Sequence, residues 1–502
     1  MNNKKDQNRI NQGHRFSADA GQGTLPEIVN LSAAGLSDAI RGKVVSCLEV
    51  MKAYLAWIDK VNPTNNAIVS LRNRDELLSE AVQKDSELSK GIYHGWMHGF
   101  PHAVKDLAAT KDIPTTMGSP LLAKEIFKHD AIFVERIKKA GAIIIGKTNT
   151  PEFGLGSQTY NSVFGTTYNA YDSKLCAGGS SGGAAVALAT RMLPVADGSD
   201  MMGSLRNPAA YNNVIGFRPS FGRVPFGPTI EIFLQQLGYE GPMGRTVRDT
   251  ALLLSTMAGF DSRIPLSIRE DPLQFAGSLQ ADMKGKKIAW LGDFRGYLPM
   301  EHGIMEMCRS SLEYFERMGC IVASVTVEYP MEKLWQTWLT LRHWLVAGSA
   351  GPLYAKIENR DKMKSEAIWE IEGGLALKAS DIYNASVERS KWYQTVANLF
   401  TEHDFLVLPS AQVFPFDAGI HWPKEVAGKS MDTYHRWMEI TVPGTLSACP
   451  IVNVPVGFNS QGLPMGMQII GPSKQDLQVL QLADAYEQAS DWTKRVPFIV
   501  TE

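Results

Sequence analysis

The sequence has almost no net charge, and this lack limits the partners that it could bind. Its 502 residues include 50 basic and 52 acidic side chains, which leaves a formal net charge of -2 at pH 7. A protein that binds nucleic acid or an anionic membrane surface needs an excess of positive charge to meet the phosphates. The charge balance therefore argues against nucleic acid and against a membrane as partners.

Long apolar runs and paired cysteines are also missing. No stretch reaches about 18 uncharged apolar residues, the length that a membrane-spanning helix needs. Residues 1–9 are polar and lack the apolar core of a secretory signal. The five cysteines show no C-x-x-C spacing, so they indicate neither a disulfide framework nor a zinc site. We therefore expect a soluble, cytoplasmic protein.

Apolar runs and helical patterns alternate along the chain. Residues 28–90 place Val44, Leu48 and Met51 at helical spacing, and residues 130–140 and 246–259 are also helix-like. Short apolar runs that are typical of buried strands occur at residues 100–104, 142–146, 287–291, 405–409 and 451–456. This alternation favours an α/β fold with helices on both faces of a sheet.

Residues 301–400 differ from the rest because they are mostly helical in pattern and rich in tryptophan. They include Trp335, Trp338, Trp344, Trp369 and Trp392. Strand-like runs return after this segment, so we interpret it as a cap-like helical insertion within one domain. The sequence predicts a polar tail at residues 1–27 and a single domain at residues 28–502.

Residues 178–183, Gly-Gly-Ser-Ser-Gly-Gly, form the first candidate site. Glycines let the backbone approach a reacting group closely, although a flexible linker has a similar composition. The following alanine-rich residues 184–189 favour a helix, so this loop leads into a helix N-terminus with unpaired N–H groups. Such a terminus stabilises developing negative charge, or equally a phosphate.

Two further motifs join this loop. Residues 198–209, Gly-Ser-Asp-Met-Met-Gly-Ser-Leu-Arg-Asn-Pro-Ala, place a second serine, Ser204, after a glycine. Residues 99–106, Gly-Phe-Pro-His-Ala-Val-Lys-Asp, end an apolar run at Lys105. A lysine in that position alone indicates only a strand end with its ammonium group in water.

Together, and in this order, the three motifs resemble those of the amidase signature family. The resemblance continues through residues 114–119, 146–153 and 462–468 and covers roughly residues 30–490. It implies a single-domain α/β fold in which a central, mixed, twisted β-sheet is covered by helices on both faces. It also implies an amidase, a hydrolase of linear amides that uses no cofactor and no metal.

The resemblance assigns a role to each motif. Ser204 would be the nucleophile, Lys105 the base, and Ser180 the bridging serine, whose preceding peptide bond is typically cis in the family. Neutral Lys105 would take a proton from Ser180, and Ser180 from Ser204, because a serine hydroxyl is a weak nucleophile until a neighbour removes its proton. An acyl-enzyme would follow.

Further residues are expected to support this chemistry. Ser181 would hold Lys105 by a hydrogen bond, and Asp200 and Arg206 would brace the turn before the nucleophile as a charged pair. Backbone N–H groups of that turn would form the oxyanion hole. The residues expected at the oxyanion hole or against the substrate are Met201, Met202, Gly203, Ser204 and Gly154.

This turn departs from the family pattern, in which a glycine or another small residue is usual. Met201 and Met202 keep the backbone donors, but their flexible thioethers would narrow the pocket and favour an apolar or aromatic substrate group. The tryptophan-rich segment also favours a bulky apolar substrate group, although tryptophans at helical spacing are usually core residues. The expected partner is a small-molecule amide, and a homodimer is one alternative for the oligomeric state.

Three other functions remain as alternatives. Residues 178–182 also match the G-x-S-x-G elbow of α/β-hydrolases, which would make Ser180 the nucleophile and require a late histidine, His421 or His435. The chain could be the glutamine-hydrolysing subunit of a tRNA-dependent amidotransferase. It could also be a catalytically silent binding protein on the same fold.

Cys176 has no evident base, and His102 is expected to be packed or hydrogen-bonded.

Overall fold

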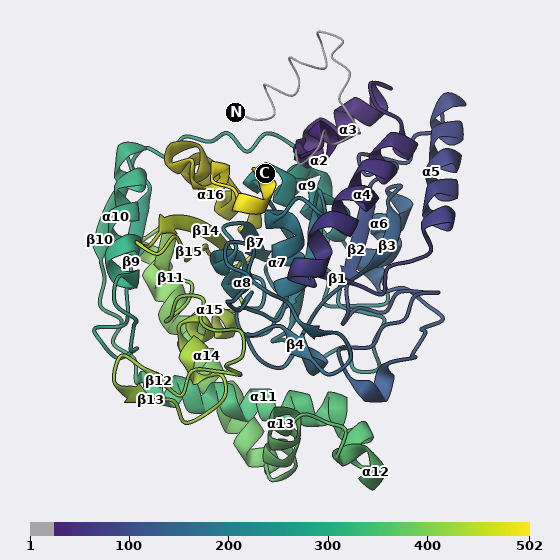
Figure 1. The fold of residues 1–502 in the computed structure, drawn as a ribbon. Coiled ribbons are helices and arrows are strands. Elements are labelled where there is room, and N and C mark those ends of the chain that lie inside the picture. The colour runs from purple at the N-terminus through teal and green to yellow at the C-terminus, as the bar shows by residue number, and fades with distance from the viewer. Residues whose placement is uncertain (1–24, 502) are drawn as a thin grey trace.

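The N-terminal part is helical, as the sequence predicts. The computed structural model describes residues 25–501, so most of the expected tail at residues 1–27 lies outside the described residues. Within the described residues, four helices precede the first motif, and one short strand, β1 (Ile68–Val69), lies between the third and the fourth (Figure 1). The helices are α2 (Glu27–Asn30), α3 (Ala33–Arg41), α4 (Cys47–Asn65) and α5 (Arg74–Ser89).

The centre of the molecule is a mixed sheet of eight strands. In spatial order, they are β10 (Ile321–Ser324), β9 (Lys287–Trp290), β11 (Phe405–Pro409), β15 (Pro464–Ile470), β14 (Ile451–Phe458), β7 (Ile215–Arg218), β8 (Tyr239–Gly244) and β6 (Ala196–Asp200). The first three are parallel, and the remaining pairs are antiparallel. The expectation of a central mixed sheet is therefore confirmed.

A second sheet of three strands lies against the edge of the first. It has the order β1-β3-β2, in which β3 (Ile143–Thr148) pairs in parallel with β2 (Pro101–Lys105). Strand β2 runs beside β6, where the backbone N–H of Lys105 donates to Asp197 Oδ2 at 3.1 Å. Two further ribbons are β4 (Tyr160–Asn161) with β5 (Gly165–Thr166), and β12 (Glu425–Val426) with β13 (Lys429–Ser430).

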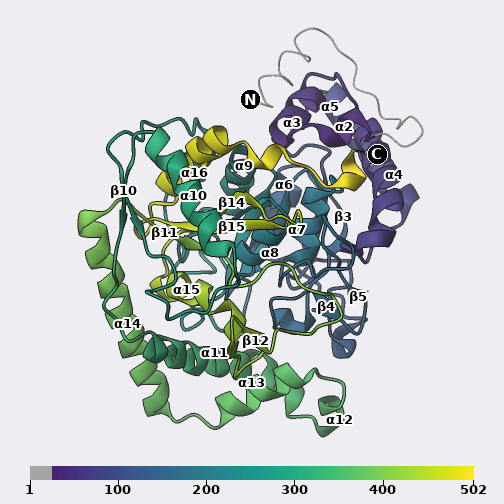
Figure 2. The ribbon, with the colours of Figure 1, turned by 60° about the vertical axis from the view of Figure 1, so that its left-hand side comes forward.

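Helices cover both faces of the central sheet (Figure 2). One face carries α9 (Val247–Met257), α10 (Ile304–Arg317) and α16 (Asp476–Ser490), and α6 (Ile132–Lys139) packs on α9. The other face carries α7 (Gly182–Ala189), α8 (Arg206–Tyr211) and α15 (Val442–Ser447). Within residues 25–501, no helix has the length and apolar character needed to cross a bilayer. The cytoplasmic location stays a prediction.

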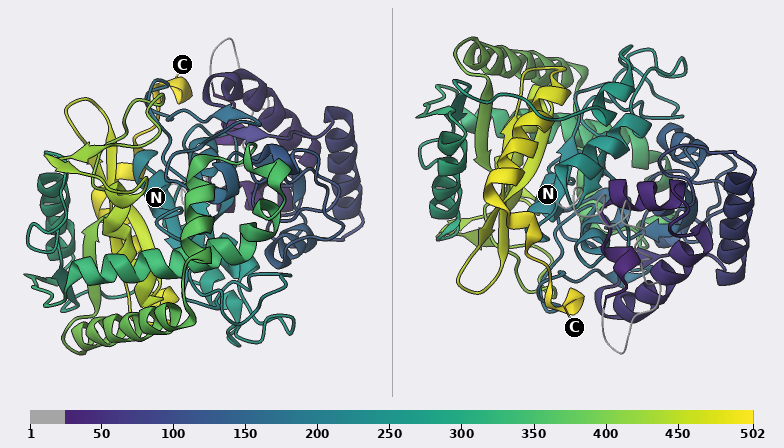
Figure 3. Two further views of the ribbon diagram at one scale, coloured as in Figure 1. Left: turned by 90° about the horizontal axis from the view of Figure 1, so that it is seen from below. Right: turned by 90° about the horizontal axis from the view of Figure 1, so that it is seen from above.

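A separate group of helices crosses one side of the sheet layer, seen from below in Figure 3. It consists of α11 (Met331–Tyr354), α12 (Ile357–Arg360), α13 (Ser365–Leu375) and α14 (Ala379–Glu402), with α11 packed against α13 and α14. The sequence analysis placed all of residues 301–400 in one helical segment. In the structure, α10 and β10 instead continue the sheet, because β10 pairs in parallel with β9. The division into one domain with an insertion stays a prediction.

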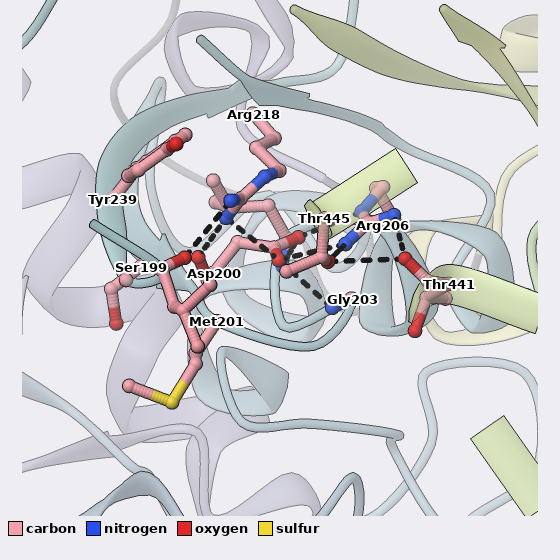
Figure 4. Close-up of polar contacts among 12 residues, drawn as sticks. Ser199, Asp200, Met201, Gly203, Arg206, Arg218, Tyr239, Thr441 and Thr445 are labelled. Atoms are coloured by element: carbon pink, nitrogen blue, oxygen red, sulfur yellow. Dashed lines mark hydrogen bonds and ion pairs between the residues drawn. The ribbon is translucent and has the colours of Figure 1, made fainter. Parts of the chain in front are cut away.

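A buried ionic network holds the turn that follows β6 (Figure 4). Asp200 ends β6 and receives a bidentate pair of hydrogen bonds from Arg206 of α8, at 3.0 Å from Nε and 2.9 Å from Nη2. Arg218 of β7 lies 3.3 Å from the same carboxylate, and all three side chains are fully buried. Arg206 Nη1 also donates to Gln468 Oε1 of β15 at 2.6 Å. The network thus ties three strands and a helix to the turn at residues 201–204.

We expect Arg206→Met to destabilise the protein severely. The change leaves Asp200 with one cation fewer and Gln468 Oε1 without its donor, and breaking a buried ion pair typically costs about 3–5 kcal/mol. The free energy of unfolding from urea titration, followed by tryptophan fluorescence, measures the loss.

The matched control is Arg263→Met. Arg263 pairs with Glu135 at 2.6 Å and with Asp261 at 2.9 Å, but its own side chain is 43% exposed. An exposed pair contributes at most about 1 kcal/mol. Equal losses for the two variants would contradict the structural role given to Arg206.

Candidate active site

The side chain of Lys105 is fully buried and surrounded by hydroxyl groups. It leaves the end of β2, and its Nζ lies 2.8 Å from Ser180 Oγ, 2.8 Å from Ser181 Oγ and 3.0 Å from Ser199 Oγ. Burial lowers the pKa of Lys105 to about 7, although the carboxylates of Glu240, Asp200 and Asp197 act in the opposite direction. The amine is therefore substantially neutral near pH 7. The expected contact between Ser181 and Lys105 is present.

The loop that carries Ser180 depends on its glycines. Gly178 has φ +71°, and a Cβ there would lie 2.6 Å from Asn207 Oδ1, so no larger residue fits without a shift. The Gly179–Ser180 peptide bond is cis, as the family resemblance implies. At the start of α7, the N–H of Gly182 donates to Thr159 Oγ1, and that of Gly183 to the carbonyl of Asn149. These bonds occupy two amides that the sequence analysis expected to be free for an anion.

Ser204 opens onto the same cavity as Ser180. Its side chain is 7% exposed, and its backbone carbonyl accepts a hydrogen bond of 3.2 Å from the N–H of Ser181. In the described part of the chain, no hydrogen bond joins the hydroxyls of Ser180 and Ser204. The link from Lys105 to Ser180 is thus formed, whereas the link from Ser180 to Ser204 is open. Such links often tighten only when a substrate is bound.

The turn before Ser204 offers fewer free donors than expected. The N–H of Gly203, one of the donors predicted for an oxyanion, donates instead to Asp200 Oδ1 at 2.8 Å. The physical reason is the tight turn, with φ +84° at Gly203, which folds this amide back onto the carboxylate. Among the described residues, the N–H groups of Met201, Met202 and Ser204 have no acceptor and remain available.

The cavity in front of these serines has a volume of about 330 Å³ and mostly apolar walls. Gly154 lies next to Ser180, because a Cβ at this glycine would come within 3.6 Å of Ser180 Oγ and 2.7 Å of Leu107 Cδ1. The sequence analysis expected Gly154 near the substrate, and it does line the cavity. Apolar side chains of the wall include Leu107, Met117, Phe153, Met201, Met202 and Leu353.

No tryptophan lines this cavity, contrary to what the tryptophan-rich segment suggested. Trp335, Trp338 and Trp392 are buried in the hydrophobic core, and Trp369 is 39% exposed. Helix α11 instead presents Val346 and other small or apolar residues to the cavity. Helical periodicity identified an apolar face, but not whether that face meets the core or the cavity.

The sequence motifs gave no role at this cavity to Ser199, Glu240 or Arg342, and His435 was considered only as a possible base for Ser180. Ser199 stood inside a recognised motif, so its neighbourhood was visible. Glu240 lies directly opposite Ser199 in the antiparallel pair of β8 and β6, which puts both side chains on the same face of the sheet. Burial raises the pKa of Glu240, and the Asp197 carboxylate raises it further.

The two late histidines do not act on Ser180. His435 makes no hydrogen bond within the described residues, and His421 stacks on Tyr160 with ring centroids 4.7 Å apart. The hydrogen-bond partner of Ser180 Oγ is Lys105. The elbow interpretation therefore lacks its base.

Cys176 and His102 have the structural roles expected of them. Cys176 is fully buried, and burial raises the pKa of its thiol to about 12, which keeps it protonated and unreactive. His102 is fully buried and lies 2.9 Å from Asp197 Oδ1 through Nε2. Both therefore belong to the scaffold that surrounds the site.

Comparisons with known proteins identify sequences and a fold similar to this chain. The amidase family profile matches residues 49–480. The chain is 31% identical to an acylamidase of Rhodococcus erythropolis over 93% of its own length and 97% of that protein. It is 30% identical to a glutamyl-tRNA(Gln) amidotransferase subunit of Acaryochloris marina, over 93% of this chain and 99% of that one. The crystal structure of a bacterial aryl acylamidase of the amidase signature family superposes with a TM-score of 0.87, at 29% identity over 94% of this chain and 98% of that chain.

Proposed function

The chain belongs to the amidase signature family of hydrolases, and we propose that it cleaves carboxylic amides with an apolar or aromatic group through an acyl-enzyme. The observation that carries this proposal is the 2.8 Å hydrogen bond between Lys105 Nζ and Ser180 Oγ, at a cavity onto which Ser204 also opens. A buried amine, a bridging hydroxyl and a second hydroxyl supply the base, the relay and the nucleophile.

The proposed reaction begins at Ser204. Its Oγ attacks the amide carbon, while its proton passes to Ser180 and the proton of Ser180 passes to neutral Lys105. The tetrahedral intermediate then collapses: the C–N bond breaks, and the proton returns through Ser180 to the leaving nitrogen. Water attacks the resulting ester by the same route, which releases the acid and restores Ser204.

The oxyanion of the intermediate would be held by backbone N–H groups of the turn. We assign this role to Met201, Met202 and Ser204, because the N–H of Gly203 already donates to Asp200. One such donor is typically worth about 2.7–4 kcal/mol of barrier. Asp200 and Arg206 would act through the shape of the turn, whereas Ser181 would position Lys105.

The lining of the cavity supports an apolar or aromatic group on the substrate. Met201 and Met202 project from the turn itself, and Phe153 and Leu353 add to the apolar wall. Thioethers adapt to the shape of a hydrophobic group and pack well against aromatic rings. The proposed partner is therefore a small-molecule amide, and anilides and arylalkyl amides are the first compounds to assay.

We expect Ser204→Ala to lose the hydrolysis of such amides almost completely, with the fold retained. Removing a serine nucleophile typically lowers kcat by several orders of magnitude. Release of aniline from a panel of anilides measures the loss, and circular dichroism checks the fold. Full activity in this variant would contradict the proposal, and absence of activity in the parent on every amide would favour a silent binding protein.

The activity should fall as the pH drops below about 7. Burial lowers the pKa of Lys105 to about 7, so the amine is neutral above that pH and gains a proton below it, which removes the base. The pH profile of kcat/KM measures this acid limb. An unchanged rate down to pH 5 would contradict the role of Lys105.

Glu240→Gln should move the acid limb to lower pH. Glu240, Asp197 and Asp200 are the three carboxylates that stabilise the protonated amine of Lys105. Glu240 also interacts electrostatically with Lys147. Losing the Glu240 charge therefore lowers the pKa of Lys105.

The control for this experiment is Glu487→Gln. Burial also raises the pKa of Glu487, but its carboxylate accepts a hydrogen bond from the backbone N–H of Val247 and does not line the cavity. The acid limb of the kcat/KM pH profile of this variant should match that of the parent. A limb that stays in place or moves to higher pH in Glu240→Gln would refute the coupling.

A second candidate function follows from the amidotransferase relative. Its 30% identity over nearly the whole chain favours glutamine hydrolysis as the alternative. Ammonia release from glutamine, assayed alone and with the other amidotransferase components, separates the two. Glutamine turnover without anilide turnover would replace the function that we propose.

A further inference from the structure

Arg342 and His435 form a polar end of the cavity that the proposed reaction does not use. Both line the cavity, and their exposed fractions are only 4% and 1%. Arg342 comes from α11, and His435 directly precedes the 3-10 helix Arg436–Thr441. Tyr434 lies beside them, because its hydroxyl accepts a hydrogen bond of 2.6 Å from Arg342 Nη2 and its ring centroid lies 4.4 Å from that of His435. We call Arg342 and His435 the polar end.

One face of the Arg342 guanidinium group lacks a good acceptor. Nε donates to Glu370, and Nη2 donates to Tyr434. Nη1 reaches only Met201 Sδ, at 3.4 Å. A thioether sulfur is a weak acceptor, so this N–H group is poorly satisfied although it is buried.

His435 is also unsatisfied. Neither of its ring nitrogens has a hydrogen-bond partner within residues 25–501. Burial lowers its pKa well below the usual value, and the Arg342 charge lowers it further, so the ring is neutral and offers one donor and one acceptor. A buried polar group that lacks a partner typically costs about 1–3 kcal/mol, which a suitable ligand would recover.

The polar end carries no net positive charge. Glu370 is fully buried, which raises its pKa, but Arg342 and the neighbouring histidines together lower that pKa below its usual value, so Arg342 and Glu370 form a neutral pair. The same cavity contains the carboxyl groups of Glu240 and Asp200, and Asp200 is already paired with Arg206 and Arg218. A substrate carboxylate would therefore find no uncompensated cation here.

We propose that the polar end binds an uncharged carboxamide-type group of the substrate, remote from the amide that is cleaved. Its carbonyl would accept from Arg342 Nη1, and its N–H would donate to the free nitrogen of His435. This inference rests on the proposed function and names a narrower substrate class: amides that carry a second amide group.

Matched compounds test this inference. Amides are prepared whose acyl portion ends in an isopropyl, a carboxamide or a carboxylate group, and a second series carries the same three groups on the amine portion. Isopropyl and carboxamide groups have nearly the same shape, so their ratio of kcat/KM isolates the hydrogen bonds. In one series we expect the carboxamide to exceed the isopropyl compound roughly tenfold and to exceed the carboxylate as well.

Variants locate the effect. His435→Phe keeps an aromatic ring against Tyr434, and Arg342→Lys keeps a cation against Glu370, so both are expected to fold. Each should lower kcat/KM for the carboxamide compound several-fold more than for the isopropyl compound. The control is His343→Phe, because His343 also contacts Glu370, at 2.8 Å, but does not line the cavity. For this variant, the ratio of kcat/KM between the carboxamide and isopropyl compounds should equal that of the parent.

Isothermal titration calorimetry of the same compounds with the Ser204→Ala variant gives the ratio of their binding affinities in the absence of turnover. Tighter binding of the carboxamide compound, lost in the double variants with His435→Phe or Arg342→Lys, supports the inference even if the proposed reaction fails. Hydrolysis of all three compounds with no carboxamide preference in either series, or a preference for the carboxylate, overturns the inference and leaves the proposed function intact.

Discussion

The removal of Lys105 from water is the constraint on which the site depends. An exposed lysine amine is protonated at neutral pH, whereas burial brings the pKa of Lys105 down to about 7. Lys147 shows that burial alone is insufficient. It is also fully buried, with a pKa lowered to about 8, but it donates to the carbonyl of Ala108 and lies outside the cavity lining. Of these two lysines, Lys105 alone combines a largely neutral amine with a hydroxyl, that of Ser180, which opens onto the cavity.

The charge of Asp200 would oppose this arrangement if it were not neutralised. A carboxylate beside Lys105 raises the pKa of the amine, and beside the turn it would repel a developing oxyanion. Arg206 and Arg218 compensate the charge, and the carboxylate is then used to fold the turn through the N–H of Gly203. This hydrogen bond fixes the turn and occupies the N–H of Gly203.

Local patterns predicted the parts of this site that local geometry determines. The motifs located Lys105, Ser180 and Ser204, and short apolar runs located β2, β3, β11 and β14. Glu240 was missed because residues 239–244 contain two glycines and a proline, and because its place beside Lys105 depends on the pairing of β8 with β6. Arg342 was missed, and His435 was considered only as a base for Ser180, for the same reason: segments far apart in the chain bring them together. The sequence therefore predicted the reaction class but not the cavity.

The low net charge of the cavity affects both substrate binding and the protonation of Lys105. In general, a negative charge about 10 Å from an amine, at an effective dielectric constant of about 20, stabilises the protonated form by about 1.7 kcal/mol, which is more than one pKa unit. An anionic substrate group would therefore protonate the base that has to cleave it. The pairing of Arg342 with Glu370 reduces the charge that Lys105 experiences. An anionic substrate would then be disfavoured in the chemical step as well as in binding, because its charge would raise the pKa of Lys105.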